Sequence, residues 1–269
     1  MKLSINGTTY HYEVYGEGAP LVLLHGFTGS RATWSPFIEK FQGFFQLILI
    51  DLPGHGETEI KQPFSMKQCC DDLKEMFTQL QLTSIHLLGY SMGGRIALSF
   101  AMYYPEIIRS LLLESASPGL EIKDERAERI KRDEKLANRI ESEGLEAFVD
   151  FWQEIPLFHS QKRLPIEKQQ AIRKERLTQT EEGLAASLRY MGTGTQPSWW
   201  NELVKASFPV LLLTGEWDEK FIKINQKMDT LFLNSQLEII STAGHAIHVE
   251  QPEIFGKIVK EFILAQDEK

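Results

Sequence analysis

Short runs of almost uninterrupted apolar residues constrain the fold of this chain more than any other feature. Such runs begin at Leu21, Leu47, Ile85, Ser110, Val210 and Leu237. Strands that are buried on both faces of a parallel sheet have this composition, because helices cover both sides of the sheet. Two earlier runs, "KLSI" and "YHYEV", predict an antiparallel hairpin at the start of the sheet. We therefore expect a mostly parallel, eight-stranded sheet.

Helix-length segments separate most of these runs, which is typical of the α/β class with helices flanking the sheet. "SMKQCCDDLKEMFTQLQL" has apolar residues at helical spacing, and "PEIFGKIVKEFILAQ" predicts a terminal helix. Residues 118–200 break the alternation, because they hold no comparable apolar run and are rich in charge. We predict a core formed by residues 1–117 and 201–269. A helical cap, residues 118–200, is inserted between the sixth and seventh strands.

Composition and charge exclude several classes of protein. The 269 residues, 42% of them hydrophobic, are sufficient for one large α/β core. A net charge of −8 argues against a nucleic-acid partner, since phosphate binding needs a basic face. No segment approaches the roughly 18 apolar residues of a membrane span, and the first residues lack a secretory apolar region. We expect a cytoplasmic protein, with Cys69 and Cys70 as packing thiols because adjacent helical cysteines neither bridge each other nor match a metal-ligand spacing.

The stretch "GYSMG", residues 89–93, lies between an apolar run and a segment that reads as helix. It matches the nucleophile elbow, in which a serine occupies a strained turn between strand and helix and small neighbours allow the backbone to bend sharply. The first amides of the following helix would face any negative charge that forms there. Ser91 is therefore the predicted reactive hydroxyl.

A serine hydroxyl needs a histidine to take its proton and an acid to orient that histidine. Asp218 follows the seventh strand and His245 the eighth, so both fall at the carboxyl edge of the sheet in the expected chain order. His248 is an alternative histidine. Glu114, at the end of the sixth strand, is an alternative acid.

The loop "LLHGFTGS" follows the third strand, and a loop at this place commonly donates one backbone N–H of an oxyanion hole. Phe27 and Met92 are the predicted backbone donors. His25 and His55 could suggest a metal site, but no third ligand lies at a convincing spacing. We predict no metal and no other cofactor, and assign these histidines structural roles in loops.

The elements "HGFTGS", "DLPGHGET", "GYSMGGR", "GEWDEKF" and "GHAIHVEQP", spread over almost the whole chain, resemble the α/β-hydrolase superfamily. The cap motifs "SPGLEIKDERAERIKRDEKLA", "DFWQEIPLF" and "GTGTQPSWW", together with "GYSMGGR", resemble the 2-succinyl-6-hydroxy-2,4-cyclohexadiene-1-carboxylate synthases of menaquinone biosynthesis. The superfamily motifs are shared by many activities. The cap motifs are more specific, and they imply a carbon–oxygen lyase on an α/β-hydrolase scaffold.

The resemblance also concerns several arginines that could contact the substrate. Arg95, one helical turn after Ser91, either pairs with a nearby carboxylate or, as the resemblance implies, binds a substrate carboxylate. The resemblance also implies substrate contacts for Arg129 and Arg176. The i,i+4 pairs Glu125–Arg129 and Glu128–Arg132 leave a salt-bridged surface helix as the alternative, which we accept for Arg126 and Arg132.

Two aromatic residues, Tyr90 and Trp152, are expected to wall the same pocket, although Trp152 could equally pack between cap and core. Together these residues suit a small substrate with several carboxylates. The resemblance implies elimination of pyruvate from 2-succinyl-5-enolpyruvyl-6-hydroxy-3-cyclohexene-1-carboxylate, with Ser91 acting as a general base. The same triad would also serve a carboxylic-ester or thioester hydrolase through an acyl-enzyme at Ser91. A ligand receptor on a hydrolase scaffold is a third possibility, against which the intact triad argues.

Overall fold

The computed structural model of the protein describes residues 1–60 and 63–267. One eight-stranded sheet runs through it in the order β1-β2-β4-β3-β5-β6-β7-β8. The strands are β1 (Lys2–Ile5), β2 (Thr8–Tyr15), β3 (Ala19–Leu24), β4 (Phe45–Ile50), β5 (Ile85–Tyr90), β6 (Ile108–Glu114), β7 (Val210–Gly215) and β8 (Ser235–Ile240). The pairings β1–β2 and β2–β4 are antiparallel, and the others are parallel. The predicted hairpin and mostly parallel sheet are confirmed.

Helices cover both faces of this sheet, which explains the uninterrupted apolar runs: every residue of β5 and β7 is buried. The helices of the core are α1 (Ser35–Phe41), α2 (Met66–Gln79), α3 (Met92–Tyr103), α8 (Glu219–Leu231), α9 (Ile247–Glu250) and α10 (Pro252–Asp267). Helices α2, α3 and α8 share one hydrophobic cluster with the sheet, whereas α1, α9 and α10 share the cluster on its other face. Cys69 and Cys70 are buried free thiols in the first cluster.

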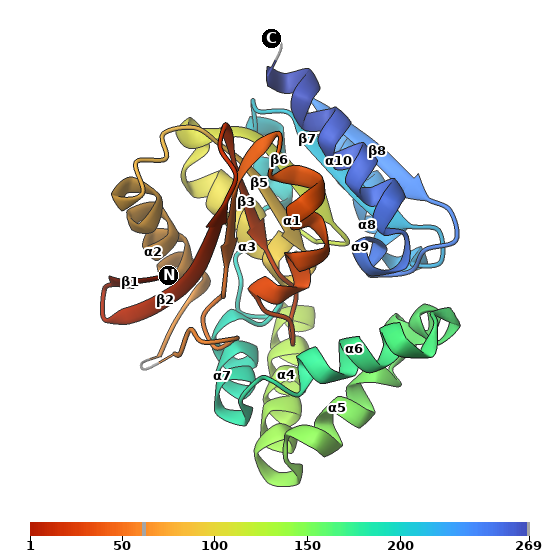
Figure 1. The fold of residues 1–269 in the computed structure, drawn as a ribbon. Helices are drawn as coiled ribbons and strands as arrows, with labels where there is room; N and C mark the ends of the chain where they lie inside the picture. Colours follow the sequence, from red (N-terminus) through yellow and green to blue (C-terminus); the bar gives the residue numbers. More distant parts are fainter. Residues whose placement is uncertain (61–62, 268–269) are drawn as a thin grey trace.

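Four further helices lie between β6 and β7: α4 (Lys123–Glu143), α5 (Leu145–Gln153), α6 (Ile166–Arg176) and α7 (Glu181–Met191). They gather beyond one end of the sheet in Figure 1. A separate apolar cluster joins α4, α5 and α7, and Phe27 of the core packs against it. Helices α4, α5 and α7 therefore share an apolar cluster that contacts the loop after β3.

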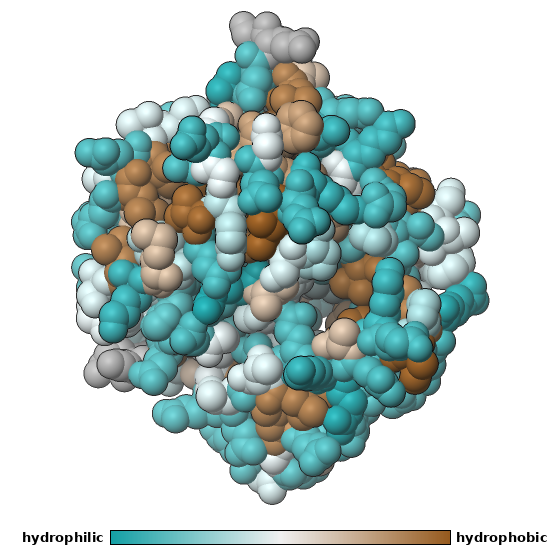
Figure 2. Space-filling view, viewed as in Figure 1, coloured by the Kyte–Doolittle hydropathy of each residue, from teal (hydrophilic) through white to brown (hydrophobic). Residues whose placement is uncertain are grey.

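Hydrophilic residues surround separate, smaller hydrophobic patches on the face seen in Figure 2. Within residues 1–60 and 63–267, the helices are too short or too polar to cross a lipid bilayer.

Candidate active site

Ser91 occupies a sharp turn between β5 and α3. Its backbone has φ +50° and ψ −104°, a conformation that non-glycine residues rarely adopt. A Cβ atom at Gly89 would lie 2.3 Å from the carbonyl oxygen of Gly93, and one at Gly93 would lie 2.2 Å from that of Leu24. Glycine is therefore required at both positions for the turn to close, as the elbow pattern predicts.

His245 and Asp218 reach Ser91 from the loops that follow β8 and β7. The Oγ hydroxyl of Ser91 lies 2.9 Å from Nε2 of His245, and Nδ1 of His245 lies 2.6 Å from Oδ2 of Asp218. Since a carboxylate only accepts, Nδ1–H donates to Asp218 and Nε2 is free to accept the serine proton. His245 is 1% and Asp218 7% exposed, so the hydrogen bond between them is shielded from water.

The alternative histidine and the alternative acid pair with each other. Nδ1 of His248 lies 2.9 Å from both carboxylate oxygens of Glu114, and the backbone N–H of His248 donates to Glu114 at 3.0 Å. Both side chains are buried. This second pair anchors the start of α9 rather than contacting Ser91.

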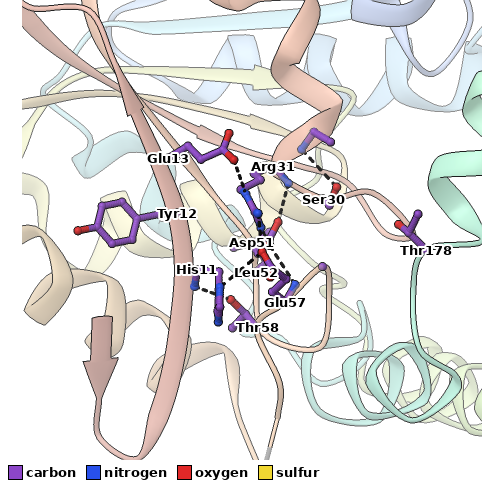
Figure 3. A network of polar contacts seen from close by, with 12 residues as sticks. His11, Tyr12, Glu13, Ser30, Arg31, Asp51, Leu52, Glu57, Thr58 and Thr178 are labelled. Carbon is purple, nitrogen blue, oxygen red and sulfur yellow. Dashed lines mark hydrogen bonds and ion pairs between the residues drawn. The ribbon is translucent and has the colours of Figure 1, made fainter. Parts of the chain in front are cut away.

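The loop that carries Phe27, a predicted oxyanion donor, is tied to the loop after β4. Asp51 accepts from the backbone N–H of Arg31 at 2.7 Å and from that of Glu57 at 3.0 Å. The Arg31 guanidinium forms ion pairs with Asp51, Glu57 and Glu13 (Figure 3). These contacts fix the backbone four residues beyond Phe27, which matters because an oxyanion hole works through preorganised donors.

Met92, the other predicted donor, opens α3, where first-turn N–H groups lack helical acceptors. Phe27, Ser91, Met92 and His245 all line one cavity of about 150 Å³, which we call the inner cavity. Three cations also line it: Arg95, Arg129 and Lys220. Among the described residues that line it there is no Asp or Glu, so the inner cavity suits an anion.

Arg95 enters the inner cavity without a carboxylate partner among the described residues. Its Nη1 donates to the carbonyl oxygen of Met191 at 2.9 Å and to Oε1 of Gln196 at 2.7 Å. Burial lowers the pKa of Arg95 to about 9, with further lowering by Arg129 and opposition from Asp133. The sequence left two roles open for Arg95, a salt bridge within the protein and binding of a substrate carboxylate. The described residues offer no salt bridge, so the guanidinium is able to bind an anionic ligand.

The cap arginines differ in their partners. Arg129 pairs with Asp133 at 2.8 Å, not with Glu125, and still lines the inner cavity. Arg132 pairs with Glu128 as the surface alternative predicts. Arg126 differs from the salt-bridged alternative, because its guanidinium donates to backbone carbonyl oxygens of the 192–199 loop, at Gly194 and Gln196, and has no carboxylate partner among the described residues.

Of the two expected aromatic walls, only Trp152 lines the inner cavity. Its ring packs against Phe27, Phe148 and Phe158, and its buried indole N–H has no hydrogen-bond partner among the described residues. Trp152 thus packs between the helices of residues 118–200 and the core, and it also lines the inner cavity.

Tyr90 and Arg176 lie elsewhere, which corrects the expectation of a single pocket. Both line a neighbouring cavity of about 60 Å³, which shares Phe27 with the inner cavity. Tyr90 is the last residue of β5, and the centre of its ring lies 5.5 Å from that of the His245 ring. Arg176 sits over the ring of Phe158, 4.7 Å from its centre, and donates to Gln161 at 3.3 Å. Burial lowers the pKa of Arg176, which Tyr90 and Glu175 oppose.

Lys220 is the charged residue of the inner cavity that the sequence reasoning missed. It lies in the first turn of α8, two residues after Asp218, and so follows a parallel strand at the edge where Ser91, Asp218 and His245 meet. Removal from water lowers the pKa of Lys220, as does Arg129, whereas Asp218 opposes the shift. Its position in "GEWDEKF" was a usable signal, because loops at this edge of a parallel sheet carry binding residues.

His25 and His55 take structural positions. Nε2 of His25 accepts from the backbone N–H of Leu52 at 3.0 Å, and Nδ1 donates to the carbonyl oxygen of Gly26 at 2.8 Å. Burial lowers the pKa of His25 to about 4 and that of His55 to about 3, so both rings are neutral near pH 7. In the described part of the chain, no three His, Cys, Asp or Glu side chains gather as a metal site.

The chain is similar to known proteins over most of its length. A family model described as alpha/beta hydrolase fold matches residues 19–252. The chain is 50% identical over 259 residues, 94% of each protein, to a protein of Bacillus subtilis named putative 2-succinyl-6-hydroxy-2,4-cyclohexadiene-1-carboxylate synthase. It is 34% identical to the synthase of that name from Salmonella schwarzengrund, covering 87% of this chain and 90% of the relative. The solved structure of MenH from S. aureus superposes with a TM-score of 0.92 at 39% identity, covering 96% of this chain and 99% of that one.

Proposed function

Since this chain belongs to the 2-succinyl-6-hydroxy-2,4-cyclohexadiene-1-carboxylate synthase family within the alpha/beta hydrolase fold, we propose that it eliminates pyruvate from 2-succinyl-5-enolpyruvyl-6-hydroxy-3-cyclohexene-1-carboxylate. The product is the cyclohexadiene that names the family. One observation carries the proposal from family to chemistry: a cavity lined by Ser91 and three cations without a lining carboxylate. A substrate with several carboxylates fits that charge pattern.

The triad acts by moving a proton. His245 takes the proton of Ser91 Oγ while Asp218 orients the imidazole and stabilises its charged form. The serine oxygen then removes the acidic ring proton beside the succinyl carbonyl. The electron pair moves through the ring double bond, the carbon–oxygen bond to the enolpyruvyl group breaks, and enolpyruvate leaves. The leaving group takes up a proton and becomes pyruvate, which restores the balance of protons.

Charge develops on the succinyl carbonyl oxygen during this step. The backbone N–H groups of Phe27 and Met92 are the proposed donors to that oxygen, where fixed donors lower the barrier most. Arg95 and Arg129 hold substrate carboxylates and thereby position the ring over Ser91. Trp152 forms an aromatic wall, and the helices of residues 118–200 close the cavity from above as a cap. Tyr90 and Arg176, which line the neighbouring cavity, have no part in this proton transfer.

The decisive experiment measures pyruvate release from the enolpyruvyl substrate, made in place by the preceding enzymes of the pathway. The wild-type protein should release pyruvate, and Ser91→Ala should lower the rate about a thousandfold or more. Ser84→Ala, which changes an exposed serine just before β5, is the matched control and should keep full activity. Background pyruvate release combined with efficient hydrolysis of simple esters would refute the lyase.

A carboxylic-ester or thioester hydrolase is the second candidate, because the 2.9 Å and 2.6 Å contacts of the triad are equally those of an acyl-transfer enzyme. A slowly deacylating ester separates the two. A hydrolase accumulates an acyl group on Ser91 and shows a burst of leaving group, whereas the proposed lyase is not labelled.

A further inference from the structure

A second cavity lies beside the inner one. This outer cavity has a volume of about 530 Å³ and is lined by residues that include Ser160, Arg163, Trp217 and Glu219. Leu157 and Lys220 line both cavities, so the two spaces are neighbours that share these side chains. Asp218, which also borders the outer cavity, has its carboxylate occupied by His245.

The inner cavity is too small for the whole proposed substrate. A cavity of roughly 150 Å³ holds one benzene molecule, whereas sites for larger ligands measure about 300–1,000 Å³. The inner cavity thus accommodates the cyclohexene ring over Ser91 but not all the carboxylate-bearing arms. The outer cavity, which lies beyond Leu157 and Lys220, has room for an arm that the inner cavity does not hold.

Two cations of the outer cavity lack carboxylate partners among the described residues. Lys220 has no ion pair there, and its ammonium group lies 5.3 Å from the centre of the Phe221 ring. Arg163 stacks over Trp217, with its guanidinium carbon 4.2 Å from the ring centre. Two acidic residues line the outer cavity, Asp218 and Glu219. Asp218 is paired with His245, which leaves Glu219 as the acidic lining residue without such a pair. Lys220, which lines both cavities, therefore has N–H donors available to a substrate carboxylate.

We propose that one carboxylate arm of the substrate passes between Leu157 and the start of α8 into the outer cavity, where Lys220 binds its carboxylate. This assignment rests on the proposed lyase function and adds a binding subsite to it. The arm stays away from the reacting bonds, so Lys220 contributes equally to binding the substrate and the transition state. Such a residue sets KM and leaves kcat nearly unchanged.

The test compares Lys220→Met with Lys220→Arg and with Lys223→Met, an exposed lysine one turn further along α8. In the pyruvate-release assay, Lys220→Met should raise KM about tenfold or more while kcat stays within about threefold. Lys220→Arg keeps the charge and should recover most of the loss, and Lys223→Met should match the wild type. A KM for Lys220→Met within about twofold of the wild type would overturn the inference.

Monomethyl esters of the substrate identify the arm. With the ester that neutralises the arm in the outer cavity, Lys220→Met and the wild type should have similar KM values, because the contact is already lost. A defect that persists with every monomethyl ester would mean that Lys220 binds none of the carboxylates, and would also overturn the inference. Failure of the lyase proposal looks different, because the wild-type protein itself would then release no pyruvate.

Discussion

Replacing Arg95 with methionine should lower activity severely without weakening the unliganded fold. Most buried side chains that make two hydrogen bonds stabilise the protein, so their loss is costly. Arg95 is different because it brings a charge into the inner cavity, and its acceptors among the described residues are neutral, the carbonyl oxygen of Met191 and Oε1 of Gln196. The folded protein carries the cost of that charge until an anion binds.

The magnitude follows from the pKa of Arg95, which burial lowers from its ordinary value to about 9 on folding. A shift of this size corresponds to at most about 5 kcal/mol of unfavourable charging at neutral pH, and relaxation with water in the cavity reduces it to about 2 kcal/mol. Methionine removes this cost but leaves the two acceptors without their donor, at about 1 kcal/mol each. The free energy of unfolding of Arg95→Met should therefore lie within about 1 kcal/mol of the wild-type value.

The pH dependence has a definite sign. Because the folded-state pKa of Arg95 lies below the unfolded-state value, the unfolded chain binds more protons between pH 9 and 12.5. The cost is complete below pH 9 and is relieved as the pH rises above it. The free energy of unfolding of Arg95→Met, measured relative to that of the wild type, should consequently be highest near neutral pH and should fall above pH 9.

Urea unfolding followed by circular dichroism, at pH 7 and near pH 10, measures the stability of Arg95→Met. Pyruvate release measures its activity, and kcat/KM should fall about a hundredfold, as expected for a lost charged contact to a substrate carboxylate. Arg132→Met, which removes an exposed ion pair, is the control for both assays. A loss of 3 kcal/mol or more for Arg95→Met, the usual result of breaking a buried ion pair, would show that Arg95 is a structural residue and refute this reasoning.

Three further predictions concern the cap, the elbow and acid stability. Arg129→Ala should lower kcat/KM in the pyruvate assay by more than about tenfold, consistent with about 2 kcal/mol for a charge contact, whereas a change within about twofold would leave it only its helical ion pair. Gly93→Ala places a Cβ atom 2.2 Å from the Leu24 carbonyl oxygen, so urea unfolding should show a loss of about 3 kcal/mol or more, and an unchanged midpoint would contradict the close approach. Burial lowers the pKa of His25 to about 4 and of His55 to about 3, so the unfolded chain binds more protons below its own pKa of 6.5. Together they should cost about 3 kcal/mol of stability between pH 6.5 and 5, and His55→Gln should remove about half of that slope in urea titrations; an unaltered slope would exclude His55 as a source.

The sheet and the order of the proposed triad could be predicted because both depend on the strands. Uninterrupted apolar runs occur where helices cover both faces, and β5 and β7 are buried throughout. Parallel strands also bring their carboxyl ends to one edge. Ser91, Asp218 and His245 follow three such strands, so their meeting required no knowledge of side-chain packing.

The cap residues could not be placed in the same way, because a helix presents side chains all around its axis. The spacing of Arg126 and Arg129 allowed either a surface or a cavity, and the outcome depended on the 192–199 loop, whose carbonyl oxygens bind Arg126. The position of the Arg176 side chain depended on where the short helical segment with Phe158 packs. The periodicity of neither segment reveals that packing.

The loop of the proposed catalytic histidine, His245, shows why two acid–imidazole pairs occur three residues apart. Glu114 binds both the backbone N–H and the ring of His248, which fixes the start of α9. Glu250 accepts from the backbone N–H groups on either side of His245, at Gly244 with 2.8 Å and at Ala246 with 3.4 Å. Two buried or half-buried carboxylates thus hold the loop in place before Asp218 orients the imidazole. A base that must accept a proton from Ser91 needs its nitrogen at a fixed position, because small displacements cost large factors in rate. The second pair therefore serves the proposed triad as its support, and it explains why a sequence can offer two plausible histidines while the fold uses only one beside the serine.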